Sequence, residues 1–229
     1  PGRGNYRARI DAEGATTNKT LSIAGKFNLD LGFANLVSVT AFQDWKFNFQ
    51  NDVDGTDLNV LNALTGGAAN GGIAQSGPYH SKNFTQELRL VSSGSDALKY
   101  VVGGFFSDAQ TDRAFARGPV IAVAGWQAEN GSKSLGLFAQ VDYKLPTKTT
   151  ISGGVRYNNE KIDVAFDNLV TPTAAQAAVP ALLNGGCFIG NSPGCRGSNK
   201  DSVVTWKGSI AQEVAPQVLV SGSVARGYK

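Results

Sequence analysis

The stretch SLGLFAQVDYKLPTKTTISGGVRYN, residues 134–158, decides the fold. Its first half places an apolar side chain at every second position, namely Leu135, Leu137, Ala139, Val141 and Tyr143. The alternation returns after Leu145–Lys148, with Ile151, Val155 and Tyr157 against Ser152, Arg156 and Asn158. Successive side chains of a strand point to opposite faces, so a period of two predicts two antiparallel strands, each with one apolar and one polar face, joined by a short turn.

The rest of the chain repeats this unit. Similar alternation covers residues 21–29, 37–49 and 84–90. Four short turns contain Gly, Pro, Asp or Ser, which favour turns: Asp30–Asn35, Ser92–Ala97, Leu145–Lys148 and Val214–Gln217. Long connections alternate with them at Gln50–Lys82, Ala116–Gly131 and Asn168–Lys200. This order is typical of an antiparallel transmembrane β-barrel with short periplasmic turns and long extracellular loops.

The membrane interpretation predicts which way each side chain faces. Charges in the middle of strands cannot face lipid cheaply, so we expect six charged residues on the concave, lumen-facing side: Lys26, Asp44, Glu87, Arg89, Asp142 and Arg156. The convex side should carry Leu21, Ile23, Val37, Val39, Leu88, Leu137, Val141 and Val155. Aromatic residues near strand ends should form the interfacial girdle: Trp45, Phe47, Phe49, Tyr100, Phe105, Tyr143, Tyr157, Trp206 and Tyr228.

Composition excludes several other classes. The net charge is only +3 and the basic residues are scattered, whereas a nucleic-acid surface needs a basic stripe. No run of 18 apolar residues suggests a transmembrane helix. No phosphate-binding loop, nucleophile motif or cofactor motif occurs, so the sequence predicts neither an enzyme nor a cofactor. A soluble β-sandwich remains an alternative, although it does not account for the long connections at one end.

Candidate ligand contacts lie in the first long connection. Asp52 and Asp54 belong to an acidic cluster with Asp57, but the calcium-loop pattern needs Gly and Glu where Asp57 and Ala63 stand, so no metal site is predicted. Tyr79 and His80 are adjacent and could contact a small-molecule ligand together.

Two cysteines, Cys187 and Cys195, lie in the last long connection. Their spacing does not fit a C-x-x-C motif. We predict a disulfide between them, which indicates an exported protein.

Six segments resemble successive barrel strands of TonB-dependent outer-membrane receptors. They are LVSVTAFQDW (36–45), NFTQELRLVS (83–92), YVVGGFF (100–106), LGLFAQVDYKL (135–145), ISGGVRYNNEK (151–161) and SVARGYK (223–229). The resemblance covers nearly the whole chain from about Lys19 onward. It implies that residues 1–229 form part of one 22-stranded barrel, with about eight strands here and the plug domain and C-terminal strands outside the sequence. Closure of these eight strands into a small barrel is the structural alternative.

The resemblance also implies a function. Such a receptor takes up a scarce nutrient, most often a ferric siderophore or similar iron complex, across the outer membrane of a Gram-negative bacterium. Its partners would be its own plug and remaining strands, outer-membrane lipid, the TonB–ExbB–ExbD complex and a small-molecule ligand, with no nucleic acid. A passive porin-like or adhesin barrel and a soluble carbohydrate-binding sandwich are the alternative functions.

Overall fold

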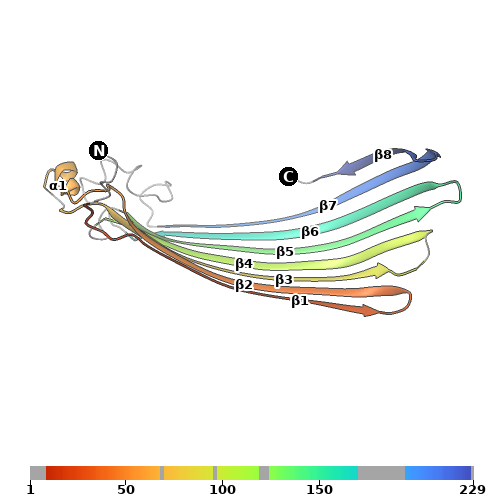
Figure 1. Cartoon of the computed structure of the whole chain (residues 1–229), viewed down its shortest axis with the longest axis horizontal. Helices are drawn as coiled ribbons and strands as arrows, with labels where there is room; N and C mark the ends of the chain where they lie inside the picture. The colour runs from red at the N-terminus through yellow and green to blue at the C-terminus, as the bar shows by residue number, and fades with distance from the viewer. Residues whose placement is uncertain (1–8, 68–69, 95–96, 119–123, 170–193, 228–229) are drawn as a thin grey trace, which may run out of the picture.

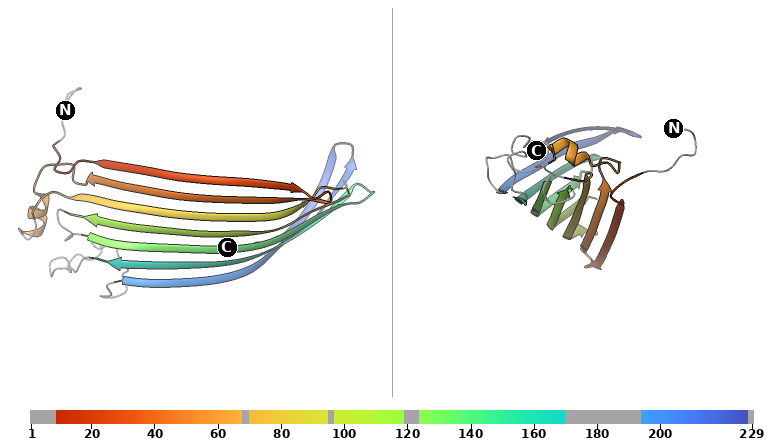
Figure 2. Two further views of the ribbon diagram at one scale, coloured as in Figure 1. Left: turned by 90° about the horizontal axis from the view of Figure 1, so that it is seen from below. Right: turned by 90° about the vertical axis from the view of Figure 1, so that its left-hand side faces the viewer.

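A computed structural model of the chain describes residues 9–67, 70–94, 97–118, 124–169 and 194–227. Its elements are β1 (Ala15–Asp30), β2 (Ala34–Asp52), α1 (Val60–Thr65), β3 (Ala74–Ser92), β4 (Leu98–Arg117), β5 (Ala124–Lys144), β6 (Thr149–Asn168), β7 (Gly194–Ala215) and β8 (Val218–Arg226). The eight strands form one antiparallel sheet in sequence order, curved along its length (Figures 1 and 2). The predicted fold class, a partial antiparallel barrel of hairpins, is confirmed.

The strands are longer than the alternation alone indicates, and the long connections are correspondingly shorter. Strands β2 to β7 contain 19 to 22 residues each. The first long connection is reduced to 53–73, which includes α1, and the second to 118–123. Polar and aromatic residues for which the sequence predicts loops continue the ladder of main-chain hydrogen bonds, because both neighbouring strands extend equally far.

Cross-strand pairing divides the sheet into two faces. Directly paired residues of neighbouring strands lie on the same face. One paired row runs from β1 to β7 through Leu29, Leu36, Leu90, Val102, Ala139, Val155 and Trp206. We call the face that carries this row the apolar face, and the other the polar face.

Five of the six charged residues expected on one face do share it. Lys26, Glu87, Arg89, Asp142 and Arg156 all lie on the polar face. Asp44 does not, because it pairs with Leu21 and Lys82 on the apolar face. The expectation for two aliphatic residues is also wrong: Val37 pairs with Arg89 and Val39 with Glu87, so both lie on the polar face. The alternation within β2 correctly divides its residues between two faces. It does not indicate which of these two faces also carries the apolar side chains of β1 and β3.

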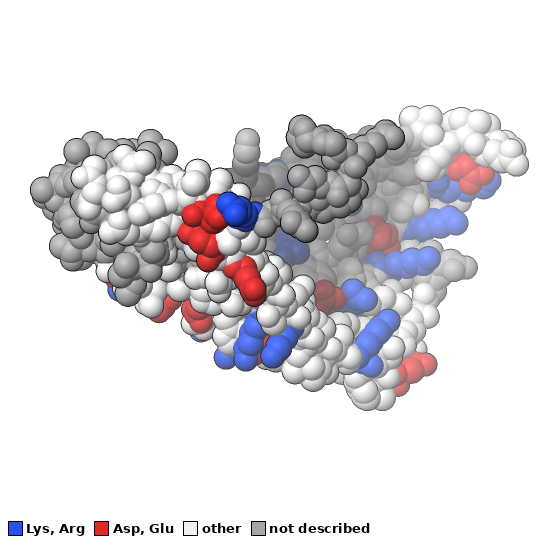
Figure 3. All heavy atoms as spheres, turned by 60° about the vertical axis from the view of Figure 1, so that its left-hand side comes forward, with Lys and Arg blue, Asp and Glu red and all other residues white. Residues whose placement is uncertain are grey.

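Glycines distinguish the concave from the convex face. A Cβ added to Gly103, on the polar face, would come within 2.7 Å of neighbouring atoms, and one added to Gly136 within 3.0 Å. A Cβ added to Gly153 or Gly208, on the apolar face, would meet nothing within 4 Å. Side chains therefore crowd together on the polar face, which is the concave one. Figure 3 shows the sheet hollowed, with Lys and Arg side chains spaced across it.

The apolar face is bare. Leu88, Leu137 and Val155 are 49%, 51% and 48% exposed, and the buried hydrophobic residues of the described chain are only Ala34, Val37 and Leu61. A β-sandwich needs a second layer on this face, and the described residues supply none. They also leave β1 and β8 unpaired with each other, so they do not form a small closed barrel.

Among the described residues, no helix has the length and apolarity needed to cross a membrane.

Candidate functional site

Aromatic and arginine side chains gather on the concave face, near the ends of the strands that adjoin the long connections. One paired row there contains Phe47 of β2, Tyr79 of β3, Arg113 of β4 and Phe166 of β6. We call the full set the aromatic–arginine cluster: Trp45, Phe47, Phe49, Tyr79, Arg113, Phe115, Arg117, Trp126 and Phe166. The cluster depends on the length of the strands. Because β2, β3 and β4 extend past residues 49, 77 and 115, their side chains stay paired in register at this end of the sheet.

Ring contacts form two groups within the cluster, one on β2 and β3 and the other on β4, β5 and β6. The Trp45 and Phe47 rings stack with centroids 5.8 Å apart, and Phe47 meets Tyr79 edge-on at 5.9 Å. On the other side, Trp126 lies 5.5 Å from both Phe115 and Phe166. Aromatic pairs at such distances contribute about 0.5–1.5 kcal/mol each beyond the area they bury. The contacts give the concave face a firm aromatic surface.

Arg113 joins the two halves of the cluster. Its guanidinium carbon lies 4.4 Å from the Tyr79 ring centroid and 4.7 Å from that of Trp126, so the cation lies between two π faces. Its Nε is buried without a hydrogen-bond partner, and no carboxylate of the described chain pairs with it. Arg113 is half-buried, and a partly desolvated cation without a counter-charge is stabilised when an anion binds beside it. The geometry therefore favours an anionic ligand with planar groups.

The edge of the cluster is fixed by close packing and hydrogen bonds. The Phe49 ring covers Gly77, where a Cβ would meet the ring at 2.8 Å. Arg117 lies 5.2 Å from the Phe115 centroid and donates to Gln75 Oε1 at 2.8 and 3.2 Å. This second cation also has no carboxylate partner among the described residues. The two arginines make this end of the concave face positive.

Three aromatic residues of the predicted interfacial girdle belong to this cluster instead. Trp45, Phe47 and Phe49 lie on the concave face, as does Phe105, so their placement in the girdle is wrong. Tyr100, Tyr143, Tyr157 and Trp206 do lie on the apolar face. Tyr228 lies outside the described residues. Sequence reasoning missed Arg113, Phe115, Arg117, Trp126 and Phe166; the aromatic–basic alternation of residues 113–117 was the available signal.

The structure places the Tyr79 and His80 side chains on opposite faces of the sheet. Residues 79 and 80 belong to β3 rather than to a loop, and their side chains point to opposite faces. Tyr79 enters the cluster, whereas His80 Nε2 lies 3.1 Å from Asp44 Oδ1 on the convex face. The two side chains therefore do not form one contact surface, and only Tyr79 adjoins the concave site.

Asp54 in segment 53–73, and Asp52 just before it, accept hydrogen bonds from other residues of the described chain. Asp54 accepts hydrogen bonds from the Ile73 amide and from the Thr56 amide and hydroxyl, the latter two at 2.9 Å. The Ile73 N–H, followed by the Thr56 groups, lowers the pKa of the Asp54 carboxyl below its ordinary value. Asp52 accepts from the Gly55 amide at 2.8 Å. A role of Asp52 or Asp54 in ligand binding stays a prediction.

Replacing Asp54 by asparagine is expected to loosen segment 53–73. The ionised carboxylate joins residue 54 to residue 73, and its lowered pKa means that this stabilisation is present at neutral pH and is lost as the pH falls through the folded-state pKa. Hydrogen exchange at the Ile73 amide should accelerate in Asp54→Asn. Asp57→Asn is the control, because the one ion pair of the Asp57 carboxylate within the described part of the chain is an exposed contact with Arg9 at 3.8 Å. Equal exchange in the two variants would contradict this role.

Other predicted residues lie apart from the cluster. Arg89 donates to Glu87 at 2.8 Å, and Arg156 donates to Asn158 at 2.6 Å, both on the concave face. No group of three or more His, Cys, Asp or Glu side chains able to hold a metal ion occurs in the described part. The predicted disulfide involves Cys187, which lies outside the described residues, and it stays a prediction.

Comparison with known proteins identifies the family to which this sheet belongs. The family model described as TonB dependent receptor-like, beta-barrel, matches residues 1–229. The chain belongs to the TonB-dependent receptor β-barrel family. Its members are receptors and transporters rather than enzymes.

A solved relative agrees with this assignment at the level of the fold. This chain is similar in structure to the ferric yersiniabactin uptake receptor FyuA from Yersinia pestis, with a TM-score of 0.65 and 16% sequence identity. The match covers 95% of this chain and 29% of the FyuA chain. No protein with a curated description matches this chain.

Proposed function

We propose that this chain is part of the barrel of an outer-membrane TonB-dependent receptor that actively takes up a ferric siderophore or a similar anionic iron complex. The observation that carries the ligand class is Arg113, a cation held between Tyr79 and Trp126 without a carboxylate partner in the described chain. Iron(III) chelates built on phenolate, catecholate or carboxylate oxygens offer negative charge together with planar groups. Such groups suit both a guanidinium and an aromatic surface.

The dimensions of the apolar face support a position in the outer membrane of a Gram-negative bacterium. Exposed apolar residues of this face extend from Leu98 to Phe106 in β4 and from Leu135 to Tyr143 in β5. Nine residues at about 3.3 Å each, tilted by about 40°, span roughly 20–25 Å. This matches the apolar band of a membrane barrel, about 25 Å tall. The remaining half of each long strand extends beyond it toward segment 53–73 and the start of β7 at Gly194, and we place this end of the sheet outside the cell.

The parent receptor would supply the other parts. Additional strands would pair with the free edges of β1 and β8, and a plug domain would occupy the concave side near Glu87 and Arg89. The TonB–ExbB–ExbD complex would provide energy through the plug. The limited coverage of FyuA supports this, since 71% of that chain lies outside the match (100 minus 29).

Deletion of the full-length receptor gene is expected to abolish uptake of one iron complex in iron-starved cells. Loss of TonB should produce the same defect, because transport through a plugged barrel needs energy. The measurement is accumulation of radioactive iron supplied as a panel of chelates. Uptake that persists without TonB would indicate a passive pore, and unchanged uptake of every chelate in the deletion strain would contradict the proposed ligand class.

A further inference from the structure

Uncharged polar side chains cover the concave face next to the aromatic–arginine cluster, on the side toward the short turns. They belong to four segments that pair in register: 20–24 in β1, 41–45 in β2, 81–85 in β3 and 107–111 in β4. We call the concave side chains of these segments the hydroxyl patch, because six of them are Thr20, Ser22, Ser81, Thr85, Ser107 and Thr111. Gln43 and Asn83 add two amides, and no member of the patch is charged.

Charged groups border the hydroxyl patch on two sides without entering it. The next paired row toward the long connections contains Tyr79 and Arg113 of the cluster, and the next row toward the short turns contains Lys26 and Glu87. The uncharged area between them measures about 13 Å along the strands and about 14 Å across them. An anionic group would find no counter-charge here, so a ligand that lies on the patch does so with an uncharged part.

The hydroxyl patch is hollowed at its centre. A cavity of about 300 Å³ lies against Ser22, Gln43, Asn83 and Thr85. Its lining also includes Ala24 and Ala41, whose methyl side chains leave the space open. Polar groups therefore surround a hollow that faces the lumen.

Two side chains of this hollow have unused hydrogen-bonding capacity. The Ser81 and Thr111 hydroxyls lie 3.0 Å apart, and Gln43 Nε2 donates to Ser22 Oγ at 3.4 Å. Asn83 and Thr85, both half-buried, have no side-chain hydrogen-bond partner among the described residues. Together they offer an amide donor, an amide acceptor and a hydroxyl that does both. A ligand with several hydroxyl groups satisfies this mixture, because each of its hydroxyls also donates and accepts.

Trp45 adds an apolar ring where the hydroxyl patch meets the cluster. Its indole N–H donates to Asn18 Oδ1 at 2.8 Å, so the ring provides a surface rather than a further donor. A pyranose ring has hydroxyl groups around its edge and C–H groups on its face. Such a face can pack on an indole while the edge reaches neighbouring amides and hydroxyls.

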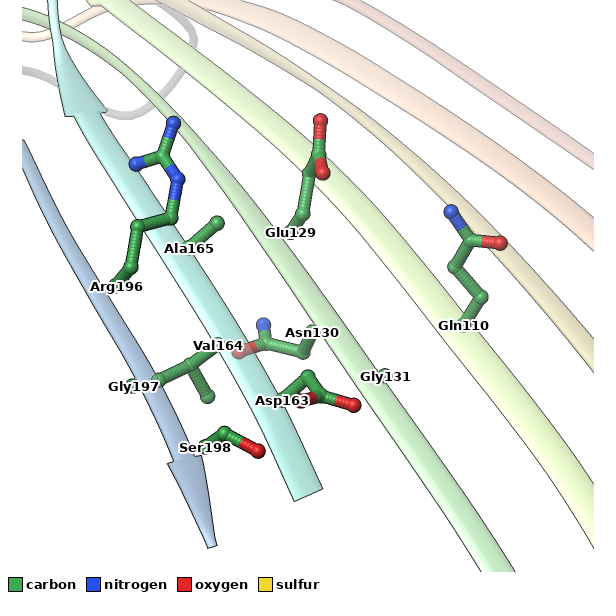
Figure 4. A pocket seen from close by; sticks show the side chains of 10 residues that line it. All are labelled: Gln110, Glu129, Asn130, Gly131, Asp163, Val164, Ala165, Arg196, Gly197 and Ser198. Carbon is green, nitrogen blue, oxygen red and sulfur yellow. The ribbon is translucent and has the colours of Figure 1, made fainter. Parts of the chain in front are cut away.

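The groove on the convex face has the opposite character. Its volume is about 510 Å³, and its lining includes Glu129, Asp163 and Arg196 (Figure 4). Asp163 lies 2.8 Å from Lys161, and Arg196 lies 2.8 Å from Asp167. Because these charges bind one another, the groove offers little to an uncharged ligand. The uncharged hollow lies instead on the lumen side, where a transported molecule passes.

We propose that the hydroxyl patch binds an uncharged carbohydrate unit, which arrives either attached to the iron complex or as a free saccharide. Asn83 and Thr85 bind its hydroxyl groups, and Trp45 packs against the face of one ring. This inference rests on the proposed uptake function of the barrel. It assigns a ligand to lumen residues that lie apart from Arg113.

The test uses the full-length receptor purified in detergent and titrated in a calorimeter with a linear glucose hexamer. Asn83→Ala combined with Thr85→Val should weaken binding about tenfold, the effect of losing two uncharged hydrogen bonds. The matched control is Asn199→Ala combined with Thr205→Val, which makes the same two changes on the concave face of β7. It should bind the hexamer as the wild type does. Equal loss in both double variants would overturn the proposal.

Two catecholate iron chelates, one with attached glucose units and one without, distinguish the sources of the sugar. If the sugar is part of the cargo, the Asn83/Thr85 variant should lose affinity for the glucose-bearing chelate. If the ligand is a free saccharide, the loss should be confined to the hexamer. In either case the sugar-free chelate should bind the variant normally, which also shows that the variant is folded.

Two outcomes separate failure of the hydroxyl patch from failure of the proposed function. A wild-type receptor that does not bind the hexamer, and that binds both chelates equally, would overturn the carbohydrate site. Binding of the hexamer without binding of either chelate would contradict the iron complex as cargo and leave the carbohydrate site in place.

Discussion

Replacing Val155 by arginine is expected to destabilise the receptor barrel by about 2–4 kcal/mol in a lipid bilayer. Val155 lies near the middle of the apolar band, 48% exposed, in a paired row with Ala139 and Trp206. An arginine there would expose its charge to hydrocarbon, which cannot hydrate it. Urea unfolding of the full-length receptor in bilayers, followed by tryptophan fluorescence, measures the free energy.

Ser152→Arg is the matched control for this prediction. Ser152 lies three residues earlier in the same strand, on the concave face and directly opposite Asp142. A new arginine there has water and a carboxylate within reach, so a change below about 1 kcal/mol is expected, as for an ordinary exposed ion pair. If the two variants lost equal stability, lipid would not cover the apolar face.

Replacing Arg113 by glutamine is expected to weaken binding of the transported iron complex by ten- to a hundredfold. A hydrogen bond to a charged group contributes about 1.5–3 kcal/mol, and loss of one such bond accounts for this range. The variant should fold normally, because no carboxylate of the described chain depends on Arg113. Titration of the full-length receptor with the chelate identified by the uptake assay provides the affinity.

Two further variants separate charge from shape and position. Arg113→Lys keeps the charge but loses the planar group between Tyr79 and Trp126, so an intermediate affinity is expected. Arg156→Gln removes a cation from the same concave face but away from the aromatic–arginine cluster, where Arg156 donates to Asn158, and should bind the chelate normally. Full affinity in Arg113→Gln would exclude Arg113 from ligand contact.

The sequence by itself determined the antiparallel hairpin order and the existence of two unlike faces. Both properties are local: Leu135, Leu137 and Val141 alternate with polar neighbours whatever lies beside them, and a short turn such as 145–148 permits only an adjacent antiparallel partner. Five of the six charges that the sequence predicts for the lumen could be assigned to one face of the sheet on this basis. The resemblance of six successive segments also predicted the family.

Tertiary structure alone decided strand length, the direction of β2 side chains and the composition of the site. Strand ends depend on how far the neighbouring strand continues to pair, so Tyr79 and His80, placed in a loop by sequence, belong to β3. The face of Val39 depends on its pairing with Glu87 rather than on its own hydrophobicity. The cluster around Arg113 joins residues of five strands across 122 positions, from Trp45 to Phe166 (166 minus 45, plus one). Only cross-strand register, a non-local property, brings those side chains together on one surface.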